Sequence, residues 1–287
     1  FAPVYRPEDV YISTLFGSLS QLDAGVTTVF DISQIHHSPA HSDATIKALR
    51  DSQRRAVFGY FESAGGVAGN QYPNDARRIK REHFSSSDQL ITMFMGGEIY
   101  LPGYEAAWAI GRELAIPVAC HIVGTFGMRP TFDMLAANNA FTSDNLFVHM
   151  TGMSDMAWQK VRDVGAAVSL AVPIEMNMRH GTPPIQKALD LGIQPSLSTD
   201  VECTLTADMF TQMRSTMALQ RMFINGRALG ENGPAETSLP ALLKARDVLR
   251  FATMNGARDL KLDRRVGSLT PGKEADIIIL DAEAINV

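Results

Sequence analysis

Three residues with metal-binding side chains each follow an apolar run that is typical of a short buried strand. His121 follows the run 116–120, His149 follows 145–148 and Asp200 follows 195–199. Parallel strands of a barrel direct their carboxyl ends to one mouth, so we expect the three side chains to meet there. Two imidazoles and a carboxylate suit a divalent metal that activates water. One such residue alone is usually structural, but three at matching positions favour the site of a metal-dependent hydrolase.

These strand ends belong to a regular alternation of predicted strands and helices. Seven strands are expected to begin near residues 26, 55, 89, 116, 145, 166 and 193. Helices are expected over 8–23, 43–52 (with Ser42 as its N-cap), 74–83, 104–114, 130–139, 154–164, 183–191, 206–227 and 244–254. This alternation predicts a parallel α/β sheet with right-handed crossovers. An open doubly wound sheet is the competing architecture, but the Gly-rich phosphate turn that it usually carries is missing after the first strand.

Seven strands are one short of a closed (β/α)8 TIM barrel, so we expect the missing strand upstream of Phe1. Two later segments extend this prediction. Met209, Met213, Met217 and Met222 recur at helical spacing, and we expect them to pack in the core. Beyond the Pro-Gly turn at 271–272, the run Ile277–Leu280 predicts a strand that pairs with something outside the barrel.

Composition narrows the classes of partner. The 287 residues carry a formal net charge of −5, which gives no electrostatic footprint for nucleic acid or an anionic membrane. No apolar run approaches the roughly 20 residues that span a bilayer, and the first residues lack a signal-peptide pattern. The two cysteines, Cys120 and Cys203, do not make a disulfide framework. We therefore expect a cytoplasmic protein in which Cys120 packs as a small hydrophobe.

The C-terminal part carries a more specific pattern. Residues 252–258 read Ala-Thr-Met-Asn-Gly-Ala-Arg, and residues 267–276 read Gly-Ser-Leu-Thr-Pro-Gly-Lys-Glu-Ala-Asp. Together with residues 31–44, these stretches resemble the amidohydrolase superfamily, in the branch that contains cytosine and guanine deaminases, S-adenosylhomocysteine deaminases and triazine hydrolases. The resemblance implies a TIM-barrel hydrolase domain over 1–262, incomplete at its N-terminus. It also implies that 263–287 are the C-terminal segment of a flanking β-sandwich.

The resemblance also assigns roles. It implies that His121, His149 and Asp200 contribute to one divalent metal site, with zinc as the expected ion and iron as the alternative. Asp200 takes the proton of the activated water, and His149 orients the nucleophile and the substrate. The His-x-His ligand pair of this family is absent from the 287 residues, so we expect this incomplete chain to bind metal weakly or not at all.

Two departures from the family pattern leave the substrate open. Deaminases of this branch usually carry a glutamate three residues after the fifth-strand histidine, and here that position is Gly124. Three glutamates in the loops of the predicted mouth are candidate replacements: Glu98, Glu175 and Glu202. Loop residues expected to contact substrate or shape specificity are His36, His37, Glu175, Arg179, His180 and Glu202, although a solvated pair is an equal alternative for His36 and His37.

We therefore expect a metal-dependent hydrolase of non-peptide C–N bonds, acting as a deaminase or cyclic amide hydrolase on a nitrogen heterocycle. The expected partners are a small heterocyclic substrate and further copies of the chain in a homo-oligomer, with no nucleic acid and no membrane. Two alternatives stay open. One is a triazine-type hydrolase that expels an amine or a halide. The other is a catalytically inactive barrel used for binding.

Overall fold

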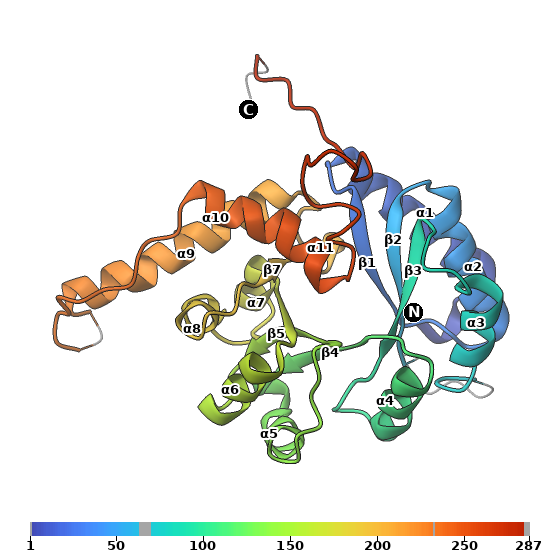
Figure 1. Ribbon diagram of the computed structural model, residues 1–287, viewed down its shortest axis with the longest axis horizontal. Helices are drawn as coiled ribbons and strands as arrows, with labels where there is room; N and C mark the ends of the chain where they lie inside the picture. Colours follow the sequence, from blue (N-terminus) through green and yellow to red (C-terminus); the bar gives the residue numbers. More distant parts are fainter. Residues whose placement is uncertain (1, 63–69, 232, 284–287) are drawn as a thin grey trace.

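Seven parallel strands form a single curved sheet in the computed structural model, which describes residues 2–62, 70–231 and 233–283 (Figure 1). The strands are hydrogen-bonded in sequence order, from β1 to β7. They are β1 (Thr28–Ser33), β2 (Arg55–Tyr60), β3 (Ile91–Gly96), β4 (Val118–Val123), β5 (Asn145–Thr151), β6 (Ala167–Leu170) and β7 (Ser196–Leu197). The sheet is a half-barrel of alternating strand–helix units, in which β1 and β7 are the two edges. The predicted parallel α/β alternation is confirmed, and the open doubly wound alternative is not favoured.

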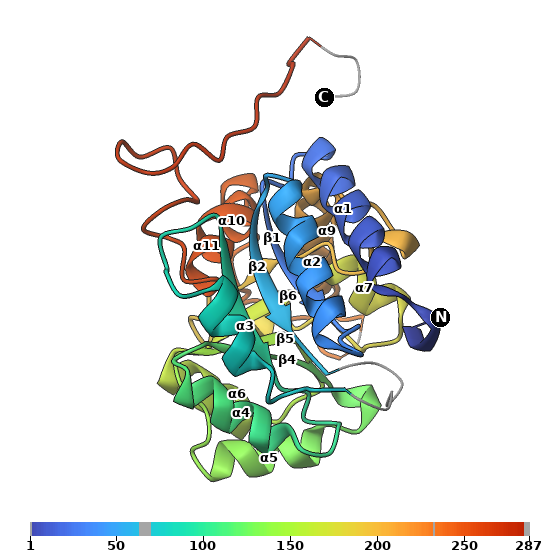
Figure 2. The ribbon, with the colours of Figure 1, turned by 90° about the vertical axis from the view of Figure 1, so that its right-hand side faces the viewer.

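Most of the helices cover the convex side of this sheet (Figures 1 and 2), whereas Ala257 of the last helix packs in the inner cluster on the concave face. The helices are α1 (Pro7–Asp23), α2 (Pro39–Asp51), α3 (Ala76–His83), α4 (Tyr104–Glu113), α5 (Arg129–Ala137), α6 (Asp155–Val164), α7 (Val172–Asn177), α8 (Ile185–Asp190), α9 (Met209–Leu229), α10 (Ala245–Arg250) and α11 (Gly256–Asp259). A π-helical turn over Phe251–Asn255 joins α10 to α11. Short 3-10 turns lie at Ala2–Val4, Gly124–Phe126 and Glu202–Thr204.

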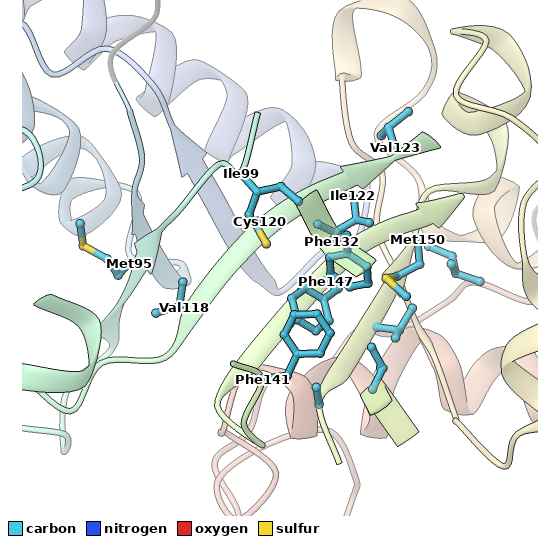
Figure 3. Packing of buried hydrophobic residues seen from close by; sticks show 14 of the residues in the cluster. Met95, Ile99, Val118, Cys120, Ile122, Val123, Phe132, Phe141, Phe147 and Met150 are labelled. Carbon is cyan, nitrogen blue, oxygen red and sulfur yellow. The ribbon is translucent and has the colours of Figure 1, made fainter. Parts of the chain in front are cut away.

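The core has two layers because successive side chains of a strand point to opposite faces. Figure 3 shows part of the outer layer, where Cys120 and Ile122 of β4 lie near Phe147 and Met150 of β5. A smaller inner cluster on the concave face includes Val57, and its other buried members are Phe61, Phe94, Ala119, Leu146, Ala257, Leu262 and Val266. Cys120 is buried and unpaired, as expected. His121 stands between two outer-layer residues, so its side chain belongs to the concave face.

The start of α2 differs from the prediction. The helix begins at Pro39 with Ser38 as its N-cap, so Ser42 is not the cap. Proline is favoured at the first helical position, since its fixed φ suits the helix and its missing N–H would be unpaired there. Ser42 lies one turn inside the helix, where its hydroxyl is 2.9 Å from Nδ1 of His36.

Two predictions about the C-terminal third are also corrected. Met209, Met213 and Met217 pack against the core as expected, whereas Met222 is exposed. The strand predicted over Ile277–Leu280 is not formed, and these four side chains are largely exposed. The segment projects away from the body of the molecule (Figure 1). An apolar strand needs a neighbouring strand for its backbone hydrogen bonds, and none lies beside it in the described chain.

No described helix is long and apolar enough to cross a membrane.

Candidate active site

His149 reaches the concave face through an irregularity in β5. Phe147 and Met150 are three residues apart, yet both pack in the outer layer. The side-chain alternation therefore shifts by one residue between them, and His149 follows Val148 to the inner face. The register with β4 shifts at the same place, between Ile122 and Val123. Bulges of this kind re-aim side chains and are frequent beside active sites.

The three predicted strand-end residues lie together at the carboxyl end of the sheet. The rings of His121 and His149 are stacked, with centroids 5.7 Å apart and an interplanar angle of 25°. Nε2 of His149 is 3.4 Å from Oδ2 of Asp200. The side chain of His149 is 1% exposed, whereas His121 and Asp200 are partly exposed and line a cavity of about 930 Å³. The predicted convergence on one mouth agrees with this geometry.

Two of these residues hold strained backbone conformations. His149 has a φ of 72° and Asp200 a φ of 58°, in the left-handed region that non-glycine residues rarely occupy. Met150, next to His149, has a φ of 54°. Such conformations cost about 1–3 kcal/mol each and cluster at functional sites. Gln53, Ala115, Asn139 and Lys261 have similar φ values in other parts of the chain, so the strain supports a functional role for His149 and Asp200 only together with their contact.

A buried glutamate contacts the Nδ1 atom of each histidine. Glu98, two residues after β3, contacts Nδ1 of His121 through Oε1. Glu175 in α7 places its Oε1 3.2 Å from Nδ1 of His149. Both glutamates are fully buried. The sequence predicted that both glutamates lie in loops at the mouth. Their positions close to strand ends were the one signal that could have identified them as partners of the histidines.

Burial and charge set the pKa values of the site. Burial opposes protonation of His121, but the Glu98 carboxylate, by its charge and contact with the ring, raises the pKa of this imidazole overall. Burial and the neighbouring His121 lower the pKa of His149. Burial raises the pKa of Glu175 to about 8. Neighbouring groups whose pKa values are displaced in opposite directions are typical of acid–base sites.

The other predicted contact residues take varied positions. His180 is buried, and its ring lies 4.6 Å from that of His149. His37 is also buried, and its Nε2 is 2.7 Å from the carbonyl oxygen of Ala2, so the solvated-loop alternative is wrong for it and for the buried His36. Glu202 accepts a hydrogen bond of 2.5 Å from the Ser20 hydroxyl of α1. Arg179 is exposed, with a φ of 58°.

No side chain fits at Gly124 without a shift of the backbone. A Cβ atom there would lie 2.9 Å from the carbonyl oxygen of Thr151 and 3.0 Å from Cα of Gly152. Real Cβ atoms essentially never show contacts below 3.0 Å, so the contact with Thr151 excludes a side chain in this backbone position. The close approach of the two strand ends therefore leaves no room in this chain for the glutamate that the resemblance led us to expect at this position.

The donor set suits a divalent metal in type but not in number. Metal-binding histidines commonly give their other ring nitrogen to a carboxylate, as His121 and His149 do. Within the described ranges, however, no group of three or more His, Cys, Asp or Glu side chains is arranged to hold a metal ion. His121, His149 and Asp200 are therefore a partial donor set.

A half-barrel of βα units with polar residues at the carboxyl ends of its strands defines a TIM-like α/β protein. The chain belongs to the amidohydrolase family, whose pattern matches residues 125–286, more than half of its length.

Individual relatives agree with this family. A 5'-deoxyadenosine deaminase from Methanosarcina mazei is 28% identical over an alignment of 290 positions, which covers 96% of this chain and 62% of that protein. A zinc-bound adenosine deaminase from Xanthomonas campestris has the same fold, with a TM-score of 0.78 and 22% identity over 96% of this chain and 62% of that one. A variant of the atrazine chlorohydrolase of Arthrobacter aurescens, complexed with zinc and atraton, also has this fold. Its TM-score is 0.77 and its sequence identity 16%, over 94% of this chain and 64% of that one. The chain thus spans about three fifths of the length of these relatives.

Proposed function

We propose that this chain carries the site of a metal-dependent hydrolase of C–N bonds in nitrogen heterocycles, most simply an aminohydrolase that releases ammonia. The observation that carries the proposal is the contact between His149 and Asp200 beside His121, at the carboxyl end of the sheet. Family membership and the named deaminase relative support it. His121 and Asp200 also line one end of a cavity that opens beside the site.

Each side chain has a defined part in this proposal. His121, His149 and Asp200 are donors toward one divalent ion, zinc by preference, and the set is completed by groups outside these three. The chemistry that a bound divalent ion supplies is Lewis-acid activation of water, whose pKa it lowers to about 7. Asp200 accepts the water proton and passes it to the leaving amine. His149, held beside Asp200, orients the nucleophile, and His180 and Glu175 contact His149. The sequence-based assignment of His37 and Glu202 as substrate contacts stays a prediction, since Glu202 bonds to Ser20 and His37 lies against Ala2.

The finer architecture is part of the proposal. We infer a closed (β/α)8 barrel in which one more parallel strand lies between β1 and β7. The cavity supports this, because it runs between Thr28–Ile32 of β1 and Ser196–Leu197 of β7, so the edges of both strands border it. His121 and Asp200 lie at the end that would hold substrate, whereas Gly25 and Ile278 lie at the other. Residues 1–262 would then be the barrel domain and 263–287 part of a flanking β-sandwich.

We also infer the cellular location of the protein and its partners. The two free cysteines are consistent with a reducing, cytoplasmic location. A small heterocyclic substrate is the expected partner, and we retain a homo-oligomer as a proposal.

Metal content and ammonia release from the full-length protein test the function. The protein is purified without chelator, its zinc and iron are measured, and it is assayed with 5'-deoxyadenosine, cytosine and guanine. About one tightly held ion per chain and ammonia release that requires Asp200 support the proposal. Chloride or alkylamine release from substituted triazines without ammonia release from the other substrates would favour the triazine-type alternative. No metal and no turnover would favour an inactive binding barrel.

A further inference from the structure

Glu98 and Glu175 repeat one arrangement on neighbouring strands. Glu98 follows β3 and reaches His121 on β4, whereas Glu175 follows β6 and reaches His149 on β5. In each pair a carboxylate oxygen lies at Nδ1 of the imidazole. The two rings are stacked 5.7 Å apart, so the two pairs stand side by side at the mouth.

Each glutamate is fixed by further contacts with the backbone. Oε2 of Glu98 accepts a hydrogen bond of 3.1 Å from the backbone N–H of His121, and its own backbone N–H donates to Oε1 of Glu62 at 2.9 Å. Oε1 of Glu175 accepts a hydrogen bond of 2.9 Å from the backbone N–H of Ala171. Both side chains are 0% exposed, so neither carboxylate reaches substrate. Any effect of the two glutamates on the reaction is therefore transmitted through the histidines.

These contacts decide which ring nitrogen carries the proton. Oε1 of Glu175 already accepts an N–H from Ala171, so a proton on this carboxyl group would sit on Oε2 and leave Oε1 an acceptor. Oδ2 of Asp200 lies 3.4 Å from Nε2 of His149, beyond the usual hydrogen-bond range, so Glu175 is the better-placed acceptor and the hydrogen belongs at Nδ1. Both Glu98 oxygens likewise face nitrogen atoms of His121. In a neutral imidazole with Nδ1–H, the lone pair is left on Nε2.

We propose that Glu98 and Glu175 are positioning residues that hold His121 and His149 in the Nδ1–H tautomer, leaving Nε2 of each ring to the site. Nε2 of His149 is the atom that faces Asp200 at 3.4 Å. The role of these tautomers in metal binding rests on the proposed function. Which nitrogen carries the proton can be measured independently of that function. Carboxylate partners of metal-binding histidines are typically worth 10–100-fold in metal affinity.

The tautomers are measured by 15N NMR of histidine-labelled, metal-free full-length protein at a pH where both rings are neutral. Signals are assigned by their loss in His121→Asn and His149→Asn. We expect protonated Nδ1 and unprotonated Nε2 for both rings. A proton on Nε2 of either ring in the unmodified protein overturns the proposal, and this result needs no folded variant.

Variants then separate the two pairs. Glu98→Leu removes the acceptor and is expected to move the His121 proton to Nε2 without affecting His149, and Glu175→Leu does the reverse. Glu98→Gln and Glu175→Gln keep an acceptor oxygen, so they restore Nδ1–H but lower zinc affinity by about 10–100-fold. Glu105→Gln, on the exposed first turn of α4, changes neither ring. Unchanged tautomers in folded Leu variants would contradict the proposal. Correct tautomers without metal binding or turnover would instead contradict the proposed function alone.

Discussion

Nε2 of His149 and Oδ2 of Asp200 face each other across 3.4 Å, and both residues hold a left-handed backbone. His149 lies in β5 and Asp200 follows β7, 51 positions later in the sequence. The two backbone conformations therefore do not arise from one local sequence pattern. Strain of this kind persists only where surrounding structure over-determines it. In this chain the bulge in β5 and the turn after β7 bring the two strained residues to one point.

Replacing Asp200 by asparagine should abolish ammonia release and leave the melting temperature within a few degrees. Asparagine matches aspartate in size and is among the residues that tolerate a left-handed backbone, but it cannot accept the water proton. Activity and thermal melting followed by circular dichroism check this in the full-length protein. Asp163→Asn, on the exposed surface of α6, is the matched control. Turnover at the unmodified rate would refute the role of Asp200.

Glu202→Gln should lower kcat by less than about tenfold, below the range of roughly 10²–10⁴ for general acid–base help. The glutamate is engaged by the Ser20 hydroxyl of α1 and follows the strand end without being part of it. The assay is steady-state kinetics with metal content measured in parallel. A larger loss at unchanged metal content would identify Glu202 as the replacement for the glutamate missing at Gly124.

Gly124→Ala should destabilise the protein by about 1–3 kcal/mol, the usual cost of overpacking. The new Cβ would meet the carbonyl oxygen of Thr151 at 2.9 Å, and backbone atoms cannot swing away as a flexible side chain does. Gly17→Ala in α1 is the matched control, since its Cβ would meet nothing within 4 Å. This control should be neutral or stabilising by about 0.5–1 kcal/mol, because alanine is the better helix former. Urea denaturation of both variants measures the difference, and equal effects would contradict the steric explanation.

Asp276→Ala should destabilise the body of the protein and free the C-terminal segment. Arg55 is almost fully buried, and its Nε donates to Oδ2 of Asp276 at 2.7 Å while Nη2 contacts Glu274. Removing the sole partner of a buried charge costs about 3–5 kcal/mol. Glu274 still pairs with Nη2 of Arg55 in this variant, so we expect a smaller loss than that.

Denaturant melting and limited proteolysis after residue 270 measure the two effects of this change. Glu236→Ala removes the exposed Arg227–Glu236 pair and serves as the control, with an expected effect within about 1 kcal/mol. A tail that stays protected in Asp276→Ala would show that other contacts hold it.

Because of the buried Asp259, the free energy of unfolding should fall as the pH rises from about 4 to 7. Burial raises the pKa of its carboxyl group from 3.8 to about 7 in the folded state. Between these values the folded protein holds a proton that the unfolded chain has lost, so raising the pH removes this contribution and the effect levels off above pH 7. Each unit of pKa difference corresponds to about 1.4 kcal/mol. Asp259→Asn should flatten this part of the curve of unfolding free energy against pH, and a curve with the same slope in both proteins would rule the group out.

Local patterns in the sequence determined the order of the elements and the positions of the site residues along the chain. Alternating apolar runs and helical periodicities depend on nearby residues, so the seven strands and the placement of His121, His149 and Asp200 near strand ends could be predicted. The same reasoning failed at Ile277–Leu280, whose apolar run is typical of a strand. A strand exists only where a neighbour supplies hydrogen bonds, and sequence periodicity does not contain that neighbour.

Tertiary structure alone decided how the three strand-end residues are oriented and which further groups join them at the site. The phase shift in β5 that turns His149 inward depends on how β5 pairs with β4. The contacts of Glu98 with His121 and of Glu175 with His149 join residues 23 and 26 positions apart, and the space at Gly124 is closed by Thr151 and Gly152. These relationships follow from the packing of one strand end against the next, because each side chain is held by atoms that lie far from it along the chain.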